Sequence, residues 1–291
     1  MHNVILPKPF DGAEHGSFTW PCGNQAALLL HGFPGTPAEM QPLGKVLNHA
    51  GWTVYGMMLP GLGADIESLE RRRLQDWTDA ATRAMDDLKR KHDSVLLIGY
   101  SMGGALALHT ATEKRPDGLV LIAPFWTLGG GWLTSLWPLI RLLFRRVRPL
   151  QHADFSAMDV RSGLQRMFAN IDLDNIETQQ ALRQITLSSS TIEQIQQLGR
   201  SAFARAAKID VPTLVIQGSR DRVVPPKRTA RLLNRFSGHV ECIAVNSAHD
   251  LVDPACSGWT EVTAGLIRFA DSIRRRSTDG HPEPCEMKKS L

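Results

Sequence analysis

The sequence contains little cysteine, no long uninterrupted apolar run and no strong excess of one charge. Its four cysteines form neither a C-x-x-C pair nor a zinc-ligand spacing, so we expect reduced thiols rather than a disulfide scaffold or a structural zinc site. The net charge is +4, and the arginine clusters lie far apart without a recognised nucleic-acid module. We therefore expect a solvated basic surface and no nucleic-acid partner.

No segment is apolar for long enough to cross a bilayer. The most apolar stretch, residues 132–144, is interrupted by Pro138 and Arg141, and it is shorter than the about 20 apolar residues that a spanning helix needs. Residues 1–11 lack a charged region followed by an apolar stretch, so we expect no secretory signal and a cytoplasmic protein.

Strand-like apolar runs alternate with helical ones along most of the 291 residues. This alternation predicts an α/β fold with a mainly parallel sheet flanked by helices. The expected strands are residues 26–30, 52–57, 94–98, 118–122, 213–217 and 240–245. The expected helices are residues 37–50, 74–91, 103–114, 226–236 and 259–275.

The alternation stops in the middle of the chain, where no comparable strand appears over some 80 residues. A stretch of this length without strands is typical of an inserted helical cap. We therefore expect a core made of residues 1–124 and 207–275, a helical cap or lid over 125–206, and a disordered tail over 276–291, which is polar and contains proline.

The apolar start of the predicted cap has two interpretations. It is either a lid helix over an apolar pocket, which we favour, or an interfacial helix that rests on lipid with its arginines toward the head groups. The two could hold together in an enzyme of lipid-like substrates, which would then associate peripherally with a membrane. Trp126 and Trp132 are the candidate substrate-binding residues of this segment.

The peptide IGYSMGGALAL, residues 98–108, places one serine among glycines directly after an apolar run. Gly99 and Gly103 flank Ser101 in the spacing G-x-S-x-G. The missing Cβ atoms let a strand and a helix approach while the hydroxyl is lifted to the edge of the sheet. A turn without chemistry has the same spacing, so Ser101 is a candidate nucleophile only if it has partners.

A serine nucleophile needs a base, normally histidine. Ten histidines compete for this role. His249, in NSAHDLVDP, follows a predicted strand and is placed to project toward Ser101. His152, in the predicted cap, is a weaker rival.

The base in turn needs a carboxylate that orients it. Asp221 lies four positions beyond Gln217, where a predicted strand ends, at the same edge of the sheet. An isolated aspartate there would more often form a turn or cap the following helix. Asp250 and Asp253 are too close in sequence to His249 to be preferred.

Attack on an ester carbonyl also requires backbone donors for the developing negative oxygen. The loop LLLHGFPG, after the first strong strand, offers the N–H of Phe33. The N–H of Met102, next to the candidate nucleophile, points into the first turn of its helix. We interpret His31 as a residue that holds this loop rather than as a base.

These motifs and their order resemble those of the α/β-hydrolases and, within them, the bacterial carboxylesterases and monoacylglycerol lipases. The resemblance covers residues 24–271 and is strongest in LLLHGFPGTPAEMQPLG, PGLGAD, GYSMGGALAL, QGSRDRVVP and SAHDLVD. It implies an α/β-hydrolase fold, a triad of Ser101, Asp221 and His249, and oxyanion donors at Phe33 and Met102. The loop reads HGF rather than HGGG, and the cap matches only in position, so substrate preference does not transfer.

The expected activity is hydrolysis of short- to medium-chain acyl or aryl esters, including monoacylglycerols, through an acyl-enzyme, with no metal or organic cofactor. The expected partner is a small-molecule ester. Two alternatives stay open: the same triad acting on a C–C, amide or thioester bond, or a ligand-binding receptor on a hydrolase scaffold.

Overall fold

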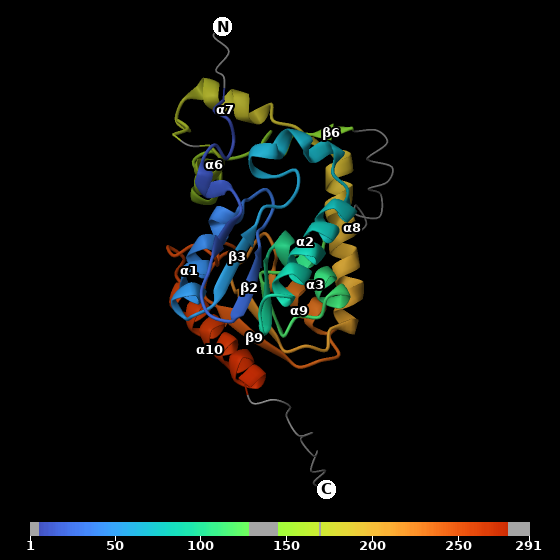
Figure 1. Ribbon diagram of the computed structural model, residues 1–291. Coiled ribbons are helices and arrows are strands. Elements are labelled where there is room, and N and C mark those ends of the chain that lie inside the picture. The colour runs from blue at the N-terminus through green and yellow to red at the C-terminus, as the bar shows by residue number, and fades with distance from the viewer. Residues whose placement is uncertain (1–5, 128–144, 169, 279–291) are drawn as a thin grey trace.

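The computed structural model describes residues 6–127, 145–168 and 170–278. Its centre is a seven-stranded sheet in the order β1-β3-β2-β4-β5-β8-β9, in which only β1 runs antiparallel to its neighbour (Figure 1). The strands are β1 Phe18–Trp20, β2 Gln25–Leu30, β3 Thr53–Met57, β4 Ser94–Tyr100, β5 Gly118–Ile122, β8 Thr213–Gly218 and β9 Val240–Val245. The predicted fold class is confirmed.

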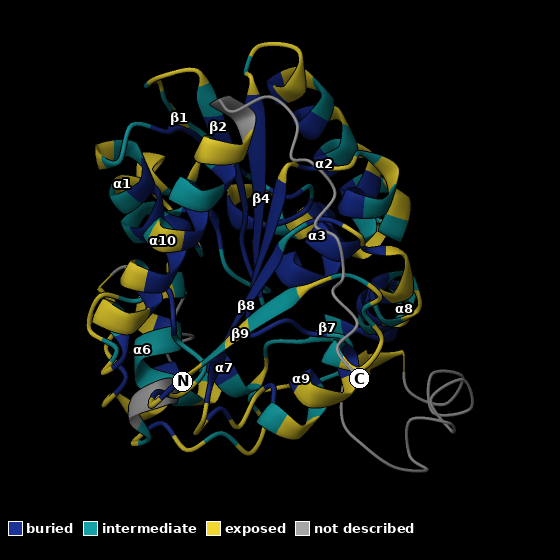
Figure 2. Cartoon of the chain, turned by 90° about the horizontal axis from the view of Figure 1, so that it is seen from below, coloured by how far each residue is buried: buried dark blue, intermediate teal, exposed yellow. Residues whose placement is uncertain are grey.

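Helices cover both faces of this sheet, as a parallel sheet requires. Every residue of β4 and β5 is buried, and Figure 2 shows β4 in the interior of the molecule. Apolar residues of α1 Gln41–His49 and α10 Trp259–Thr278 pack on one face. The other face is covered by α2 Leu74–Lys89, α3 Met102–Glu113, α8 Ser189–Arg205 and α9 Pro226–Leu233. Short 3₁₀ helices are η1 Ala13–His15, η2 Pro37–Met40, η3 Gly63–Arg71 and η4 Ala206–Lys208.

The register of the sheet brings several strand ends to one edge. Leu30 pairs with Gly99, and Gly218 pairs with Val245. The segments that follow β2, β4, β8 and β9 therefore leave the sheet at its carboxyl edge. This edge is where ligand sites of open parallel sheets form.

The segment between β5 and β8 contains α6 Met158–Met167, α7 Ile176–Arg183 and α8. It also contains a short antiparallel pair, β6 Arg146–Val147 with β7 Leu187–Ser188, which the sequence pattern did not predict. Residues around α6 and α7 form their own apolar cluster, which includes Phe155, Leu164, Phe168, Leu173 and Leu182. In contrast, α8 contributes to the main core through Ile195, Leu198 and Ala202.

Strand β1 and the end of helix α10 also differ from expectation. Strand β1 was missed because three residues are too short for an alternating pattern to stand out. Helix α10 ends at Thr278, so the predicted tail over 276–291 begins with helical residues, and its remainder lies outside the described residues. Residues 132–144, the apolar start of the predicted cap, also lie outside them. Among the helices that are described, none combines the length and hydropathy needed to cross a membrane.

Candidate active site

Ser101 occupies a strained turn between β4 and α3. Its φ of 52° and ψ of −115° are unfavourable for a residue with a side chain. A Cβ atom on Gly99 would lie 2.2 Å from the Gly103 carbonyl oxygen, and one on Gly103 would lie 2.1 Å from the Leu30 carbonyl oxygen. Both glycines are therefore required by contacts with backbone, which explains the G-x-S-x-G spacing physically.

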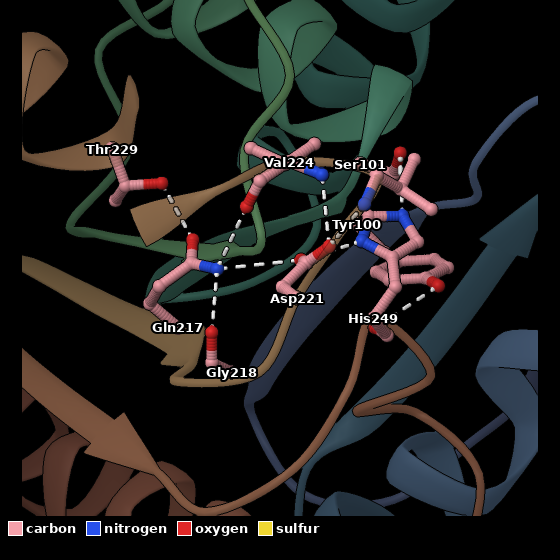
Figure 3. Close-up of polar contacts among 9 residues, drawn as sticks. Tyr100, Ser101, Gln217, Gly218, Asp221, Val224, Thr229 and His249 are labelled. Atoms are coloured by element: carbon pink, nitrogen blue, oxygen red, sulfur yellow. Dashed lines mark hydrogen bonds and ion pairs between the residues drawn. The ribbon is translucent and has the colours of Figure 1, made fainter. Parts of the chain in front are cut away.

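His249 follows β9 and lies between the other two predicted triad members (Figure 3). Its Nε2 is 3.1 Å from Ser101 Oγ, and its Nδ1 is 2.7 Å from Asp221 Oδ2. A carboxylate only accepts, so Nδ1 carries the proton and Nε2 has a lone pair for the serine proton. The structure thus brings Ser101, Asp221 and His249 together from three separate loops at the carboxyl edge of the sheet.

Asp221 is buried, and the turn after β8 orients its carboxylate. Oδ1 accepts hydrogen bonds from the backbone N–H groups of Val223 and Val224, both at 2.8 Å, which leaves Oδ2 for the imidazole. The loops that carry Asp221 and His249 touch at Gly218, where a Cβ atom would lie 2.2 Å from the Ala248 carbonyl oxygen. A close backbone approach therefore sets the distance between acid and base.

The side chain of Gln217 also holds the Asp221 carboxylate, a role that the sequence analysis did not predict. Its Nε2 lies 3.3 Å from Asp221 Oδ2 and donates to the carbonyl oxygens of Gly218 and Val224, each at 3.1 Å. Its Oε1 accepts from the Thr229 hydroxyl at 2.5 Å. The available signal was a buried amide at the end of an apolar strand, because such a group must find partners.

Tyr100 supports the imidazole from the other side. Its hydroxyl donates to the His249 carbonyl oxygen at 3.3 Å, and the two ring centroids are 5.2 Å apart. Burial raises the pKa of Tyr100 well above its usual value. The hydroxyl therefore stays protonated and able to donate.

The candidate oxyanion donors lie on the loop after β2 and at the start of α3. Met102 is the first residue of α3, where an N–H has no acceptor within the helix. In the part of the chain that the structure describes, the Phe33 N–H makes no hydrogen bond. Both donors are consequently available at the edge where Ser101 lies.

His31 holds the loop that carries Phe33. Its Nδ1 donates to the Gly32 carbonyl oxygen at 2.9 Å, and its Nε2 accepts the Leu59 N–H at 3.1 Å. Burial lowers the pKa of His31 to about 4, so the ring is neutral and both nitrogens are occupied. Because C=O and N–H of a trans peptide point in opposite directions, anchoring the Gly32 carbonyl directs the Phe33 N–H away from His31.

Residues 23–252 match the family model described as serine aminopeptidase, S33. The chain belongs to this family. The matched region runs from just before β2 to beyond His249. It therefore includes the ends of β2, β4, β8 and β9, from which the residues of the candidate site extend.

Named relatives of this S33 hydrolase are lipases and esterases. A thermostable monoacylglycerol lipase of Bacillus sp. (strain H-257) is 30% identical over 208 residues, which cover 70% of this chain and 73% of that protein. A carboxylesterase of Bacillus subtilis (strain 168) is 34% identical over 118 residues, 40% of this chain and 45% of that protein. The crystal structure of a Paleococcus ferrophilus monoacylglycerol lipase superposes with a TM-score of 0.66 at 17% identity, covering 88% of this chain and 98% of that one.

The fold likeness and the family confirm the resemblance to the α/β-hydrolases. The S33 hydrolase is accordingly a lipase- or esterase-like α/β-hydrolase.

The remaining candidate residues of the S33 hydrolase lie elsewhere or serve other contacts. His152 is exposed between β6 and α6. Asp250 and Asp253 form ion pairs with Arg166 of α6, at 3.2 and 3.5 Å. They link the loop of His249 to the cap segment.

Of the two tryptophans predicted to bind substrate, the structure describes only Trp126. Trp126 stacks on Phe203 with ring centroids 4.4 Å apart, and its indole N–H donates to the Arg228 carbonyl oxygen at 2.9 Å. This places Trp126 where the start of the cap segment meets α8 and α9. Trp132 lies outside the described residues.

Proposed function

We propose that this S33 hydrolase is a serine carboxylic-ester hydrolase that acts through an acyl-enzyme on short- to medium-chain acyl or aryl esters, monoacylglycerols among them. One observation carries the proposal. A strained serine hydroxyl lies 3.1 Å from an imidazole nitrogen whose other nitrogen lies 2.7 Å from a buried carboxylate. This is the arrangement that activates a serine as a nucleophile.

In the acylation half-reaction, Ser101 Oγ attacks the ester carbonyl carbon while His249 Nε2 takes the hydroxyl proton. The negative charge on the resulting tetrahedral oxygen is stabilised by the N–H groups of Phe33 and Met102. His249, now an imidazolium held by Asp221, then gives its proton to the departing alkoxide. The products of this half-reaction are an alcohol and an acyl group on Ser101.

Deacylation repeats these steps with water. His249 Nε2 takes a proton from the water as its oxygen attacks the acyl carbon, and the proton returns to Ser101 Oγ as the acid leaves. Asp221 keeps the imidazole in the tautomer that both half-reactions need. The cycle is balanced by water alone and calls for no metal or organic cofactor.

The acyl-chain preference rests on the cap segment. Its tryptophans and leucines favour apolar acyl or aryl groups over sugars and peptides, and the stacked pair of Trp126 and Phe203 adds aromatic surface near its start. The relatives named as monoacylglycerol lipase and carboxylesterase support the same class of substrate.

A chain-length series tests the proposal. Hydrolysis of p-nitrophenyl esters from acetate to palmitate, and of monoacylglycerols, is measured with the wild type, Ser101→Ala and the matched control Ser156→Ala, which alters an exposed serine. We expect the maximum at short to medium chains, a loss of at least about three powers of ten in kcat for Ser101→Ala, and unchanged rates for Ser156→Ala. Folded Ser101→Ala with most of the wild-type rate would refute the assignment.

The family description supplies a second candidate, hydrolysis of an amide bond at a peptide amino terminus. The same triad can cleave amides, so aminoacyl p-nitroanilides are assayed alongside the esters. Thioesters and C–C substrates are added in the same profile. A receptor that merely uses this scaffold would release at most one equivalent of p-nitrophenol, whereas an esterase turns over many times.

Peripheral lipid contact through residues 132–148 remains a separate proposal. Of its two adjacent arginines, Arg146 forms an ion pair with Glu70 at 2.9 Å. Flotation with anionic vesicles, compared between the wild type and the variant with Arg145→Glu and Arg146→Glu, tests it. Binding by the wild type that the double variant loses is expected, and absence of wild-type binding would dispose of the idea.

A further inference from the structure

Glu39 lies beneath the loop that carries the candidate oxyanion donor Phe33. It belongs to η2, seven positions after Gly32, and its Oε1 accepts the Gly32 N–H at 2.5 Å. A hydrogen bond from a backbone N–H to a carboxylate is stronger than one between neutral groups. The carboxylate therefore anchors the loop one residue before the donor.

The glycines of the HGFPG loop make room for this carboxylate. A Cβ atom on Gly35 would lie 2.4 Å from Glu39 Oε2, and one on Gly32 would lie 3.2 Å from Glu39 Oε1. A side chain at Gly35 is therefore incompatible with the observed position of the carboxylate. Glycine at position 35 therefore leaves the space that the Glu39 carboxylate occupies.

Glu39 and His31 together hold both peptide groups of Gly32. Glu39 accepts from the Gly32 N–H, and His31 Nδ1 donates to the Gly32 carbonyl oxygen at 2.9 Å. That carbonyl belongs to the same peptide plane as the Phe33 N–H. With the N–H of Gly32 released, this plane could turn about the remaining anchor, and the Phe33 N–H would leave the direction of the reacting carbonyl.

Burial and most neighbouring groups act on the pKa of Glu39 in opposite directions. Burial raises the pKa of Glu39 to about 7, the Gly32 N–H, Arg166 and His249 lower it, and Asp250 raises it. Among the described residues, no cation lies within ion-pair distance of this carboxylate. The carboxylate is therefore held by a backbone N–H rather than by a salt bridge.

We propose that Glu39 is a positioning residue for ester hydrolysis, which holds Gly32 so that the Phe33 N–H faces the developing oxyanion. This proposal rests on the proposed function. It assigns a role to a side chain that contacts the Gly32 N–H rather than a residue of the candidate triad.

Kinetics of Glu39→Ala and Glu39→Gln test it, with Glu67→Ala and Glu67→Gln as matched controls from the exposed surface of η3. For Glu39→Ala we expect kcat to fall about 10- to 100-fold with KM within about threefold, because an oxyanion donor acts in the transition state. Glu39→Gln keeps an acceptor for Gly32, so we expect kcat to recover to within about tenfold of the wild type. The Glu67 variants should match the wild type.

The pH profile separates positioning from a merely structural role. Protonation of Glu39 should add a step of at most about tenfold, with a midpoint near pH 7, to the acid side of the wild-type profile of log kcat/KM, and Glu39→Gln should lack this step. Wild-type kcat in Glu39→Ala, or the same acid-side profile in the wild type and Glu39→Gln, would overturn the proposal.

A readout without turnover distinguishes this inference from the proposed function. In protein labelled with ¹⁵N-glycine, the Gly32 amide signal should shift with a midpoint near pH 7 in the wild type and should lose that transition in Glu39→Gln. A protein with this transition but no esterase activity would overturn the proposed function and leave the Gly32 contact established. Esterase activity with a Gly32 signal indifferent to Glu39 would overturn the positioning role.

Discussion

Replacing Gln217 by leucine tests whether the candidate acid depends on support from the end of β8. Gln217 is only 4% exposed, and leucine has nearly the same size but no polar atoms. The change removes the donors to Asp221 Oδ2 and to the Val224 carbonyl oxygen, and it removes the acceptor for the Thr229 hydroxyl. The shape of the site is kept while its hydrogen bonds are lost.

The expected loss of stability follows from the groups left behind. The Thr229 side chain is 1% exposed, and in the described structure its hydroxyl and the Val224 carbonyl oxygen have no other partner that would replace Gln217. Each buried group left unsatisfied costs about 1–3 kcal/mol. Leucine recovers part of this through apolar burial, so we expect the free energy of unfolding to fall by about 2–4 kcal/mol.

The effect on catalysis should be smaller than the loss of the acid itself. Asp221 keeps the N–H groups of Val223 and Val224 and its hydrogen bond to His249. We therefore expect kcat for p-nitrophenyl butyrate to fall about 10-fold. Exchanging the acid for an amide should cost about 10⁴-fold, as in other triads.

Urea unfolding and steady-state kinetics of Gln217→Leu check both expectations. Thr229→Val is the matched control, because it removes one of the hydrogen bonds and leaves the others. The double variant completes a cycle in which the two side chains should couple by about 1 kcal/mol. A Gln217→Leu protein with the stability and kcat of the wild type would show that Asp221 needs no support from β8.

Four further predictions follow from single residues. Gly103→Ala would press a methyl group against the Leu30 carbonyl oxygen, so urea unfolding should show a loss of more than about 2 kcal/mol and the ester assay a loss of activity; a fully stable, active variant would contradict the packing argument. Arg166→Met removes partly exposed ion pairs between α6 and the loop of His249, so stability should change by less than about 1 kcal/mol, while the effect of added salt on KM should weaken; an unchanged salt response would argue against the link. Because the pKa of Glu39 is raised, its contribution to stability is complete below pH 4.5 and is lost as the pH rises through about 7. Between pH 5 and pH 8 the free energy of unfolding of Glu39→Gln should therefore rise relative to that of the wild type by on the order of 3 kcal/mol. For His109 the pH dependence of stability is reversed, because burial lowers its pKa to about 4. Its contribution to stability is present above pH 6.5 and is lost as the pH falls through about 4, so His109→Gln should resist acid unfolding better than the wild type. Parallel curves for variant and wild type would contradict either assignment.

The sheet and the candidate triad were accessible from the sequence because both follow from local rules. A long apolar run such as that of β4 predicts a buried strand, and parallel strands place the residues after their carboxyl ends at one edge of the sheet. Ser101, Asp221 and His249 each follow such a strand, so their convergence needed no knowledge of the packing. The spacing of Gly99 and Gly103 adds a steric requirement that the structure explains atom by atom.

The segment between β5 and β8, which we predicted to be a cap, was less accessible, because no strand order constrains it. Its amphipathic patterns identify helices, but they do not say that α8 packs into the main core while α6 and α7 form a cluster of their own. The two-residue strands β6 and β7 are fixed by pairing with each other, and their sequences carry no signal of it. Strand β1 depends in the same way on its neighbour β3.

The supports of the candidate site were missed for a related reason. Gln217 and Glu39 bind mostly to backbone groups, and a backbone N–H or C=O gives no side-chain identity that a motif could record. What such residues share is a polar group that folding removes from water, and the free energy of leaving it unpaired exceeds that of most single contacts. A polar residue placed where the pattern demands burial is thus itself a predictor of a hydrogen-bonded support. Applied at the strand end of Gln217, this criterion finds the residue without coordinates, whereas Glu39 lies half-buried in a short 3₁₀ helix where no pattern demands burial. Even for Gln217 the criterion says that a partner exists but not which one.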